Sequence, residues 1–284
     1  MIYISSSCIS AKKIKDAVLA LVQNGLYHIE LSGGTDYYTG LQDDLIELKE
    51  KFDIHYIVHN YFPPPKQHFV LNLASLDDTI YYNSINHYIQ AIELSKKIQS
   101  PCLGLHAGFL IDIHKDEIGK KIHYKPIFNK EKAINRFIEA YQILKDIAGD
   151  LDLYIENNVF SFSNKQTYKE NPFFLTCSEE YLELKKYINF KLLLDVAHLK
   201  VSAFTHQLSF IEEFQKLSCV SDYWHLSGND GKSDQNKALS ADTLLQSALN
   251  QCSIENLNIV TLETYEELKL IHTDHNFISK CLER

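Results

Sequence analysis

Seven short apolar segments of this chain each end on an acidic residue or a histidine. Chance alone would not place these residue types at seven successive segment ends, because only 37 of the 284 residues are acidic and only 13 are histidines. The stretches between successive segments are long enough for a helix and two loops. The pattern therefore predicts strands that alternate with helices. The segments are Leu26–Glu30, Ile54–His59, Pro101–His106, Leu151–Glu156, Lys191–Asp195, Asp222–His225 and Ile259–Glu263.

An eighth strand is predicted at Ile2–Ser5, ahead of the other seven. Apolar residues such as Ile14 and Leu21 then recur with a helical period, and Gly25 is a typical helix stop. Parallel strands joined by helical crossovers close into an α/β fold, a (β/α)8 TIM barrel. No Pro/Gly/Ser-rich linker divides the chain, so residues 1–284 are expected to form a single domain.

The long loops all follow predicted strands, whereas the returns from helix to strand are short. One such loop, Asn157–Pro172, is polar and follows the fifth strand, and a helix over Ser209–Lys216 precedes the seventh. In TIM barrels this asymmetry places the functional site at the C-terminal face, where the polar strand ends also converge.

The charge balance argues against nucleic acid as a partner. The formal net charge is −9, from 37 acids and 28 bases, and Arg136 and Arg284 are the only arginines. Tight association with phosphate backbones needs clustered lysine and arginine. The composition favours a small-molecule substrate that is neutral or modestly charged.

The cysteines and the apolar segments predict a location in a reducing cytoplasm. The six cysteines are widely spaced and form no CxxC pair, which is typical of reduced, buried thiols. The N-terminal sequence MIYISSSC resembles a strand and not a signal peptide. No apolar stretch approaches the length of a membrane span, so no membrane is expected as a partner.

Four of the strand ends predict a divalent metal site. Glu156, Asp195, His225 and Glu263 close the fifth to eighth strands, so their side chains should meet in one mouth. Any one of these residues alone would be interpreted as part of an ion pair at the barrel rim or as a solvated side chain. Together, three carboxylates and an imidazole suit Mn²⁺, Mg²⁺, Co²⁺ or Zn²⁺. Clustered carboxylates also repel one another without a cation.

The motifs around these residues resemble the xylose isomerase-like TIM barrels, which include sugar (phosphate) isomerases and epimerases and the endonuclease IV enzymes. The resemblance covers essentially the whole chain. Its most specific parts are the D-x-x-H motif on the sixth strand and the H-L-S-x-N-D-G loop after the seventh. The motifs are Ile155-Glu156-Asn157-Asn158, Asp195-Val196-Ala197-His198, His225-Leu226-Ser227-Gly228-Asn229-Asp230-Gly231 and Leu262-Glu263-Thr264.

In the epimerase branch the resemblance implies one divalent ion on Glu156, Asp195, His225 and Glu263, with His198 on a substrate oxygen. Glu156 and Glu263 would be the catalytic pair. One takes the proton from the carbon beside a metal-bound carbonyl and the other returns it, through an ene-diolate. The implied substrate is a sugar or sugar phosphate, and the implied protein is an isomerase or epimerase that can associate as a homo-oligomer.

The endonuclease IV branch implies more ligands and three zinc ions. Its pattern adds His59, His106, His198 and Asp234, all of which are present. Where that family has Asp-x-His in the loop after the seventh strand, this chain has Asp234-Gln235-Asn236, and the asparagine argues against a complete three-metal cluster while a two-metal site stays open. An abasic-site endonuclease, a dehydratase that shares the first proton abstraction, and a barrel that binds sugar without turnover are the alternatives.

Several further residues are candidates for substrate contact. Glu30 ends the second predicted strand, and His59 and His106 could contact substrate instead of metal. Lys66, Lys200 and Lys232 are expected in loops near the mouth, where they would meet a substrate phosphate as point charges. The substrate-binding candidates are Glu30, Asn157, Asn236 and Lys200.

Overall fold

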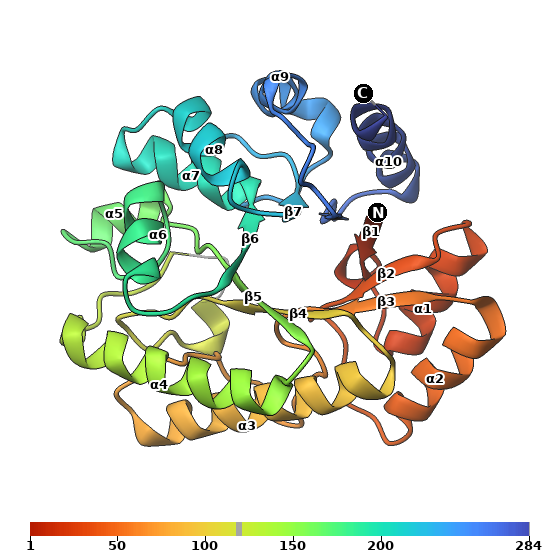
Figure 1. Cartoon of the computed structure of the whole chain (residues 1–284), viewed down its shortest axis with the longest axis horizontal. Coiled ribbons are helices and arrows are strands. Elements are labelled where there is room, and N and C mark those ends of the chain that lie inside the picture. The colour runs from red at the N-terminus through yellow and green to blue at the C-terminus, as the bar shows by residue number, and fades with distance from the viewer. Residues whose placement is uncertain (118–120, 284) are drawn as a thin grey trace.

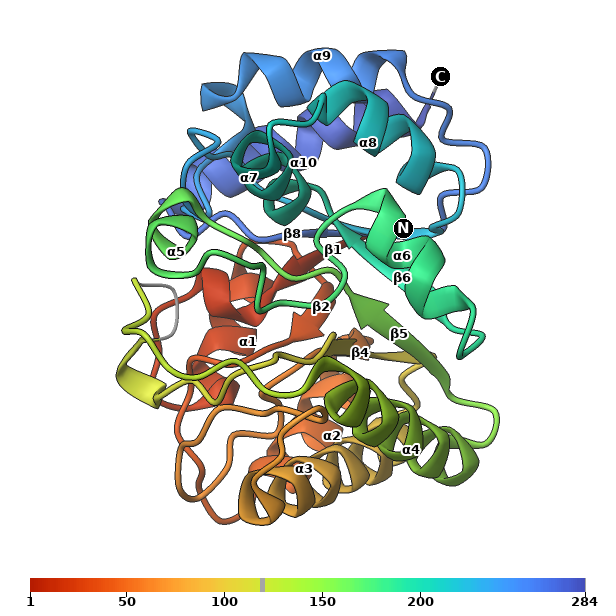
Figure 2. The same cartoon turned by 90° about the vertical axis from the view of Figure 1, so that its left-hand side faces the viewer.

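The computed structural model describes residues 1–117 and 121–283 and contains the predicted barrel. Eight parallel strands pair in chain order, and β1 closes the barrel against β8. Figure 1 shows the helices around the strands, with α3 and α4 on the side opposite α9 and α10, and Figure 2 shows the same arrangement after a quarter turn. The strands are β1 (Ile2–Ser5), β2 (His28–Leu31), β3 (His55–Val58), β4 (Cys102–His106), β5 (Asp152–Glu156), β6 (Lys191–Asp195), β7 (Tyr223–Leu226) and β8 (Ile259–Leu262).

The α-helices cover the outer surface of the barrel. The predicted helix before β7 corresponds to α8, and α5 lies within the segment 157–172 that was expected to be a loop. The described α-helices are α1 (Ile14–Gln23), α2 (Leu41–Phe52), α3 (Asp78–Lys97), α4 (Lys130–Ala148), α5 (Phe162–Thr167), α6 (Ser178–Lys185), α7 (Val196–His206), α8 (Phe210–Ser218), α9 (Thr243–Gln251) and α10 (Leu268–Leu282). Among the residues described, none of these helices is both long and apolar enough to cross a bilayer.

The helix α7 begins immediately after β6, at a position where no helix was predicted. Asp195 ends the strand and also caps the helix, since its side chain accepts a hydrogen bond from the His198 N–H at 2.6 Å. The helix is buried along most of its length. It therefore lacks the polar face that makes a helical period visible in a sequence.

The core has two apolar layers. The larger one lies between the strands and the surrounding helices. A smaller cluster fills the inside of the barrel and includes Tyr3, Ile57, Tyr154, Leu193 and Tyr223. The interior is thus packed with side chains, and the open space for chemistry is confined to the C-terminal ends of the strands.

Gly104 in β4 leaves the room that the His59 ring occupies. A Cβ at position 104 would lie 2.5 Å from His59 Cδ2 and 2.9 Å from Leu193 Cδ1. We expect Gly104→Ala to destabilise the protein by about 1–3 kcal/mol, because overpacking a rigid core forces side chains out of their rotamers. Urea denaturation would measure the change. Lys132→Ala on the exposed face of α4 serves as the surface comparison, because it adds no atoms to the core. A Gly104→Ala variant as stable as the wild type would contradict this packing account.

Candidate metal centre

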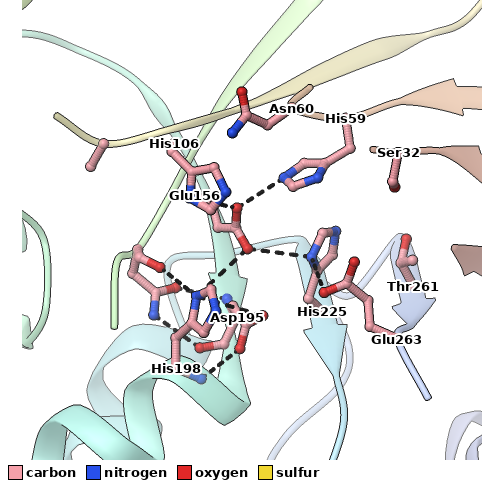
Figure 3. A network of polar contacts seen from close by, with 12 residues as sticks. Ser32, His59, Asn60, His106, Glu156, Asp195, His198, His225, Thr261 and Glu263 are labelled. Atoms are coloured by element: carbon pink, nitrogen blue, oxygen red, sulfur yellow. Dashed lines mark hydrogen bonds and ion pairs between the residues drawn. The ribbon is translucent and has the colours of Figure 1, made fainter. Parts of the chain in front are cut away.

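The ends of six neighbouring strands bring the predicted metal-binding residues into one cluster. His106, Glu156 and Asp195 are the last residues of β4, β5 and β6. His225 lies in β7, while His59 and Glu263 directly follow β3 and β8. Figure 3 shows their side chains pointing toward one another around Glu156. Most of this cluster is buried, with 8% exposure for Glu263 and 0% for His225.

His225 lies between the two glutamates of the predicted metal site. Its Nδ1 is 3.4 Å from Glu156 Oε1 and 3.4 Å from Glu263 Oε2. Asp195, His225 and Glu263 each offer one ligand atom within 4.8 Å of the others. The structure therefore brings together all four residues that the sequence analysis assigned to one ion.

The second oxygen of Glu156 faces a different pair of histidines. Glu156 Oε2 is 2.9 Å from His59 Nε2 and 3.2 Å from His106 Nδ1. These three residues form another group whose ligand atoms lie within 4.8 Å of one another. Glu156 thus belongs to two adjacent potential sites, one through each carboxylate oxygen.

The donors in this cluster fit a divalent cation. Within the described residues, the buried Nδ1 atoms of His106 and His225 have no hydrogen-bond partner, although ring nitrogens inside proteins are normally paired. Burial lowers the pKa of His106 to about 4, so its imidazole is neutral and able to ligate. Burial, together with the charges of Glu156 and Asp234, raises the pKa of Asp195 to about 7. This excess of negative charge is what a bound cation would neutralise.

Glu30 holds the far side of the His225 ring. Its Oε2 accepts hydrogen bonds from His225 Nε2 at 3.0 Å and Thr261 Oγ1 at 3.0 Å, and also from the hydroxyl of Tyr223. Its Oε1 accepts one from Ser32 Oγ at 3.1 Å. Because Nε2 donates to Glu30, Nδ1 is the ring nitrogen that faces Glu156 and Glu263. Burial lowers the pKa of His225, but the charges of Glu30 and Glu263 outweigh this effect and raise the pKa, so a bound ion would take the place of the Nδ1 proton.

The burial of Glu30 corrects the expected substrate contact. The residue is 0% exposed and lies inside the barrel. Burial raises the pKa of its carboxyl, but the charge of His225 and the hydrogen bonds outweigh this effect and lower the pKa to about 2. Glu30 is therefore an ionised partner of His225.

His198 and Asp234 form a smaller group at the edge of the cluster. His198 Nδ1 lies 2.9 Å from the Asn157 carbonyl oxygen, and its Nε2 is 3.4 Å from Asp234 Oδ2. The buried Oδ1 of Asp234 has no hydrogen-bond partner within the parts of the chain described. The side chain of Asn236 instead accepts a hydrogen bond from Ser227 Oγ at 3.2 Å. The structure does not supply a third ligand to this pair from Asn236.

Two other predicted substrate contacts have structural roles instead. The amide of Asn157 pairs with both backbone groups of Asp195, at 2.7 Å to its N–H and 2.9 Å to its carbonyl, and so fixes β5 against β6. Lys200 is not in a loop but in α7, and it is 5% exposed. Its ammonium contacts the Asp242 carboxylate at 2.5 Å and the Asn229 carbonyl at 2.8 Å. The ammonium group of Lys200 is thus held in the protein interior by these two contacts.

Sequence reasoning missed Asn60. It directly follows His59 and is 3% exposed, and Figure 3 shows it beside His106. Its Oδ1 accepts a hydrogen bond from Tyr88 at 2.6 Å, whereas its Nδ2 has no partner in the described chain. The only sequence signal was its position after a strand-end histidine.

Known proteins share the fold of this chain. No curated protein matches the sequence. A D-tagatose 3-epimerase-like protein superposes with a TM-score of 0.74 and 16% identity, over 99% of this chain and 97% of that one. D-psicose 3-epimerase from Clostridium cellulolyticum gives 0.66 at 13% identity, over 99% and 98% of the two chains.

Endonuclease IV from Thermus thermophilus has a TM-score of 0.63 at 13% identity, with 99% and 98% of the two chains covered. At such identities these likenesses establish the fold alone. The family described as "Xylose isomerase-like TIM barrel" matches residues 18–243, most of the chain. The chain therefore belongs to the xylose isomerase-like TIM barrel family.

Proposed function

We propose that this protein is a divalent-metal-dependent isomerase or epimerase of a sugar or sugar phosphate. The observation that carries the proposal is the placement of two carboxylates, Glu156 and Glu263, at 3.4 Å from the same ligand atom of His225. Asp195 completes the set of residues that would hold the ion. An ion bound there would stabilise the negative charge that develops on a substrate carbonyl oxygen when the neighbouring carbon loses its proton.

The two glutamates have different surroundings and so different parts in moving the proton. Glu263 is 8% exposed, and its Oε2 lies 3.4 Å from His225 Nδ1. It is the group assigned to remove the proton from the substrate carbon. Glu156 is held at 2.9 Å by His59 and serves as the counterpart that returns a proton. Return to the opposite face of the same carbon gives an epimer, and return to the adjacent carbon of the ene-diolate gives an isomer.

The proposal is tested by proton exchange. Protein stripped with EDTA and then reloaded with Mn²⁺, Co²⁺ or Zn²⁺ is incubated with ketoses and ketose phosphates in D₂O. We expect deuterium at the carbon beside the carbonyl only in the reloaded protein, with a rate roughly a thousandfold lower after stripping. A product that is lighter than the substrate by one water molecule would instead indicate a dehydratase. Absence of exchange with every sugar and metal would overturn the proposal.

A second function is favoured by one specific observation. His59 and His106 meet the second oxygen of Glu156, and His198 lies beside Asp234, as the endonuclease IV resemblance implies. A phosphodiesterase acting on abasic DNA would use these added ligands. The net charge of −9 and the position of Asn236 weigh against it. Incision of a duplex that carries an abasic site, with about three ions per chain, would establish this alternative over the first.

A further inference from the structure

We infer that the buried ion pair of Lys200 and Asp242 is a positioning element that places Asp234 beside His198. The inference deepens the proposed function and, for its part in catalysis, rests on it, because His198 is expected to contact a substrate oxygen. Lys200 is 5% exposed and Asp242 is 4% exposed, and lysine is almost never buried in this way unless it is paired. Lys200 Nζ and Asp242 Oδ2 are 2.5 Å apart.

Both members of the ion pair bind one residue of the loop after β7. Lys200 Nζ donates to the Asn229 carbonyl at 2.8 Å, and Asp242 Oδ2 accepts from the Asn229 N–H at 3.3 Å. The side chain of Asn229 is bound as well. Its Nδ2 donates to the Ala197 carbonyl of α7 at 2.9 Å, and its Oδ1 accepts from the Gly231 N–H at 2.8 Å. Every polar group of Asn229 is thus occupied, and the base of the loop is fixed to α7.

A short turn leads from this base to Asp234. The Oδ1 of Asp230 accepts a hydrogen bond from the Lys232 N–H at 2.9 Å, which keeps the turn tight. The turn also lies directly against α7, because a Cβ at Gly231 would be 2.3 Å from Phe204 Cδ2. A displacement at the base of the loop would therefore be transmitted to Asp234.

The contact between Asp234 and His198 depends on where the loop backbone lies. Asp234 Oδ2 is 3.4 Å from His198 Nε2. Within the parts of the chain that the structure describes, Asp234 Oδ1 has no hydrogen-bond partner that could hold the carboxylate independently. His198 lies on α7, two residues before Lys200. The helix α7 thus holds both sides of the contact, His198 directly and Asp234 through Lys200 and the loop.

The ion pair contributes more to placement than to stability. A buried ion pair adds little stability relative to an apolar pair of the same size, because both charges lose their water. An apolar pair, however, could not donate to the carbonyl and accept from the N–H of one loop residue. We call Lys200, Asn229 and Asp242 the loop clamp, and its function is to fix Asp234 relative to His198.

The first test follows the ring nitrogen signals of His198 by NMR in the metal-free protein. Lys200→Met/Asp242→Asn removes both charges together, and the asparagine keeps the oxygen that caps α9 at the Leu245 N–H. We expect this variant to move the His198 signals in the same direction as Asp234→Asn does. A variant with all three substitutions should match Asp234→Asn alone, because changes that act through one contact are not additive.

Two further variants make this test decisive. Lys191→Met/Asp152→Asn carries the same substitutions in an exposed ion pair of 2.6 Å at the N-terminal ends of β6 and β5, and it should leave the His198 signals unchanged. Asn229→Ala disrupts the loop clamp while the ion pair stays intact, so it should move the His198 signals even if the double variant does not fold. Unmoved signals in Asn229→Ala, in the folded double variant or in Asp234→Asn would refute the inference.

The second test measures turnover of the ketose or ketose phosphate identified by deuterium exchange. In Mn²⁺-loaded protein, Lys200→Met/Asp242→Asn should lower kcat/KM by up to about a hundredfold, the factor for moving a positioning group by about 1 Å. Adding Asp234→Asn should cause no further loss. Unchanged kcat/KM, or losses that multiply, would overturn the positioning role.

The two tests separate this inference from the proposed function. If the His198 signals move as expected but no sugar is turned over by the wild-type protein, the positioning role stands and the proposed function fails. If sugar is turned over while the loop clamp variants leave the His198 signals unmoved, the proposed function stands and the positioning role is refuted.

Discussion

Glu156→Gln should lower turnover roughly a thousandfold and should weaken metal binding throughout the centre. The reason is that the two oxygens of Glu156 face two different ligand sets, His225 on one side and His59 with His106 on the other. An amide supplies only one good ligand oxygen and cannot act as an acid or base, a role commonly worth between a hundredfold and ten thousandfold. Ion content after dialysis and steady-state turnover measure the two effects.

The comparison with Glu263→Gln makes this prediction sharper. Glu263 belongs with Asp195 and His225, so its replacement should abolish turnover and leave the ligand set of His59, His106 and Glu156 intact. Glu93 is exposed on α3, and Glu93→Gln controls for the loss of one negative charge. Normal turnover in both the Glu156→Gln and Glu263→Gln proteins would rule out the catalytic pair.

The second large effect is expected from Glu30→Gln, which leaves the four predicted ligands Glu156, Asp195, His225 and Glu263 in place. Glu30 fixes the orientation of the His225 ring by accepting from Nε2 at 3.0 Å. Loss of such a partner behind a metal ligand commonly costs tenfold to a hundredfold in metal affinity. We expect a loss of this size for Zn²⁺ or Mn²⁺, measured by competition with a chromogenic chelator.

Two observations decide whether Glu30 acts through His225. Thermal unfolding of the metal-free variant shows whether the barrel remains folded, and Glu47→Gln on α2 is the matched control. If Glu30 contacted substrate instead, KM would rise while the chelator competition stayed unchanged. That result would restore the sequence-based prediction for this residue.

The barrel and the convergence of its strand-end acids and histidines were predictable because they depend on periodicity. Buried parallel strands appear as short apolar runs, and the residue where each run stops lies at the open edge. Glu156 and Asp195 follow this rule, since each is the last residue of its strand. The resemblance to the xylose isomerase-like barrels, which the family match confirms, rested on the motifs at these same ends.

Glu30 and Lys200 show where the sequence was insufficient. The predicted strand ended at Glu30, but β2 continues to Leu31, which places the carboxylate inside the barrel and not at its rim. A difference of one residue in the strand end determines where the carboxylate lies, and apolar patterns do not locate strand ends to within one residue. Lys200 was expected in a loop because α7 is buried on nearly all sides and its sequence shows no amphipathic period.

If both ligand sets bind an ion, the shared carboxylate of Glu156 would couple their affinities. An ion bound by His59 and His106 at Glu156 Oε2 would draw electron density through the carboxyl group from Oε1, the oxygen that faces His225. Occupancy of one position would then alter the affinity of the other, and this linkage is reciprocal. Metal titrations of this protein should accordingly deviate from the sum of two independent binding curves.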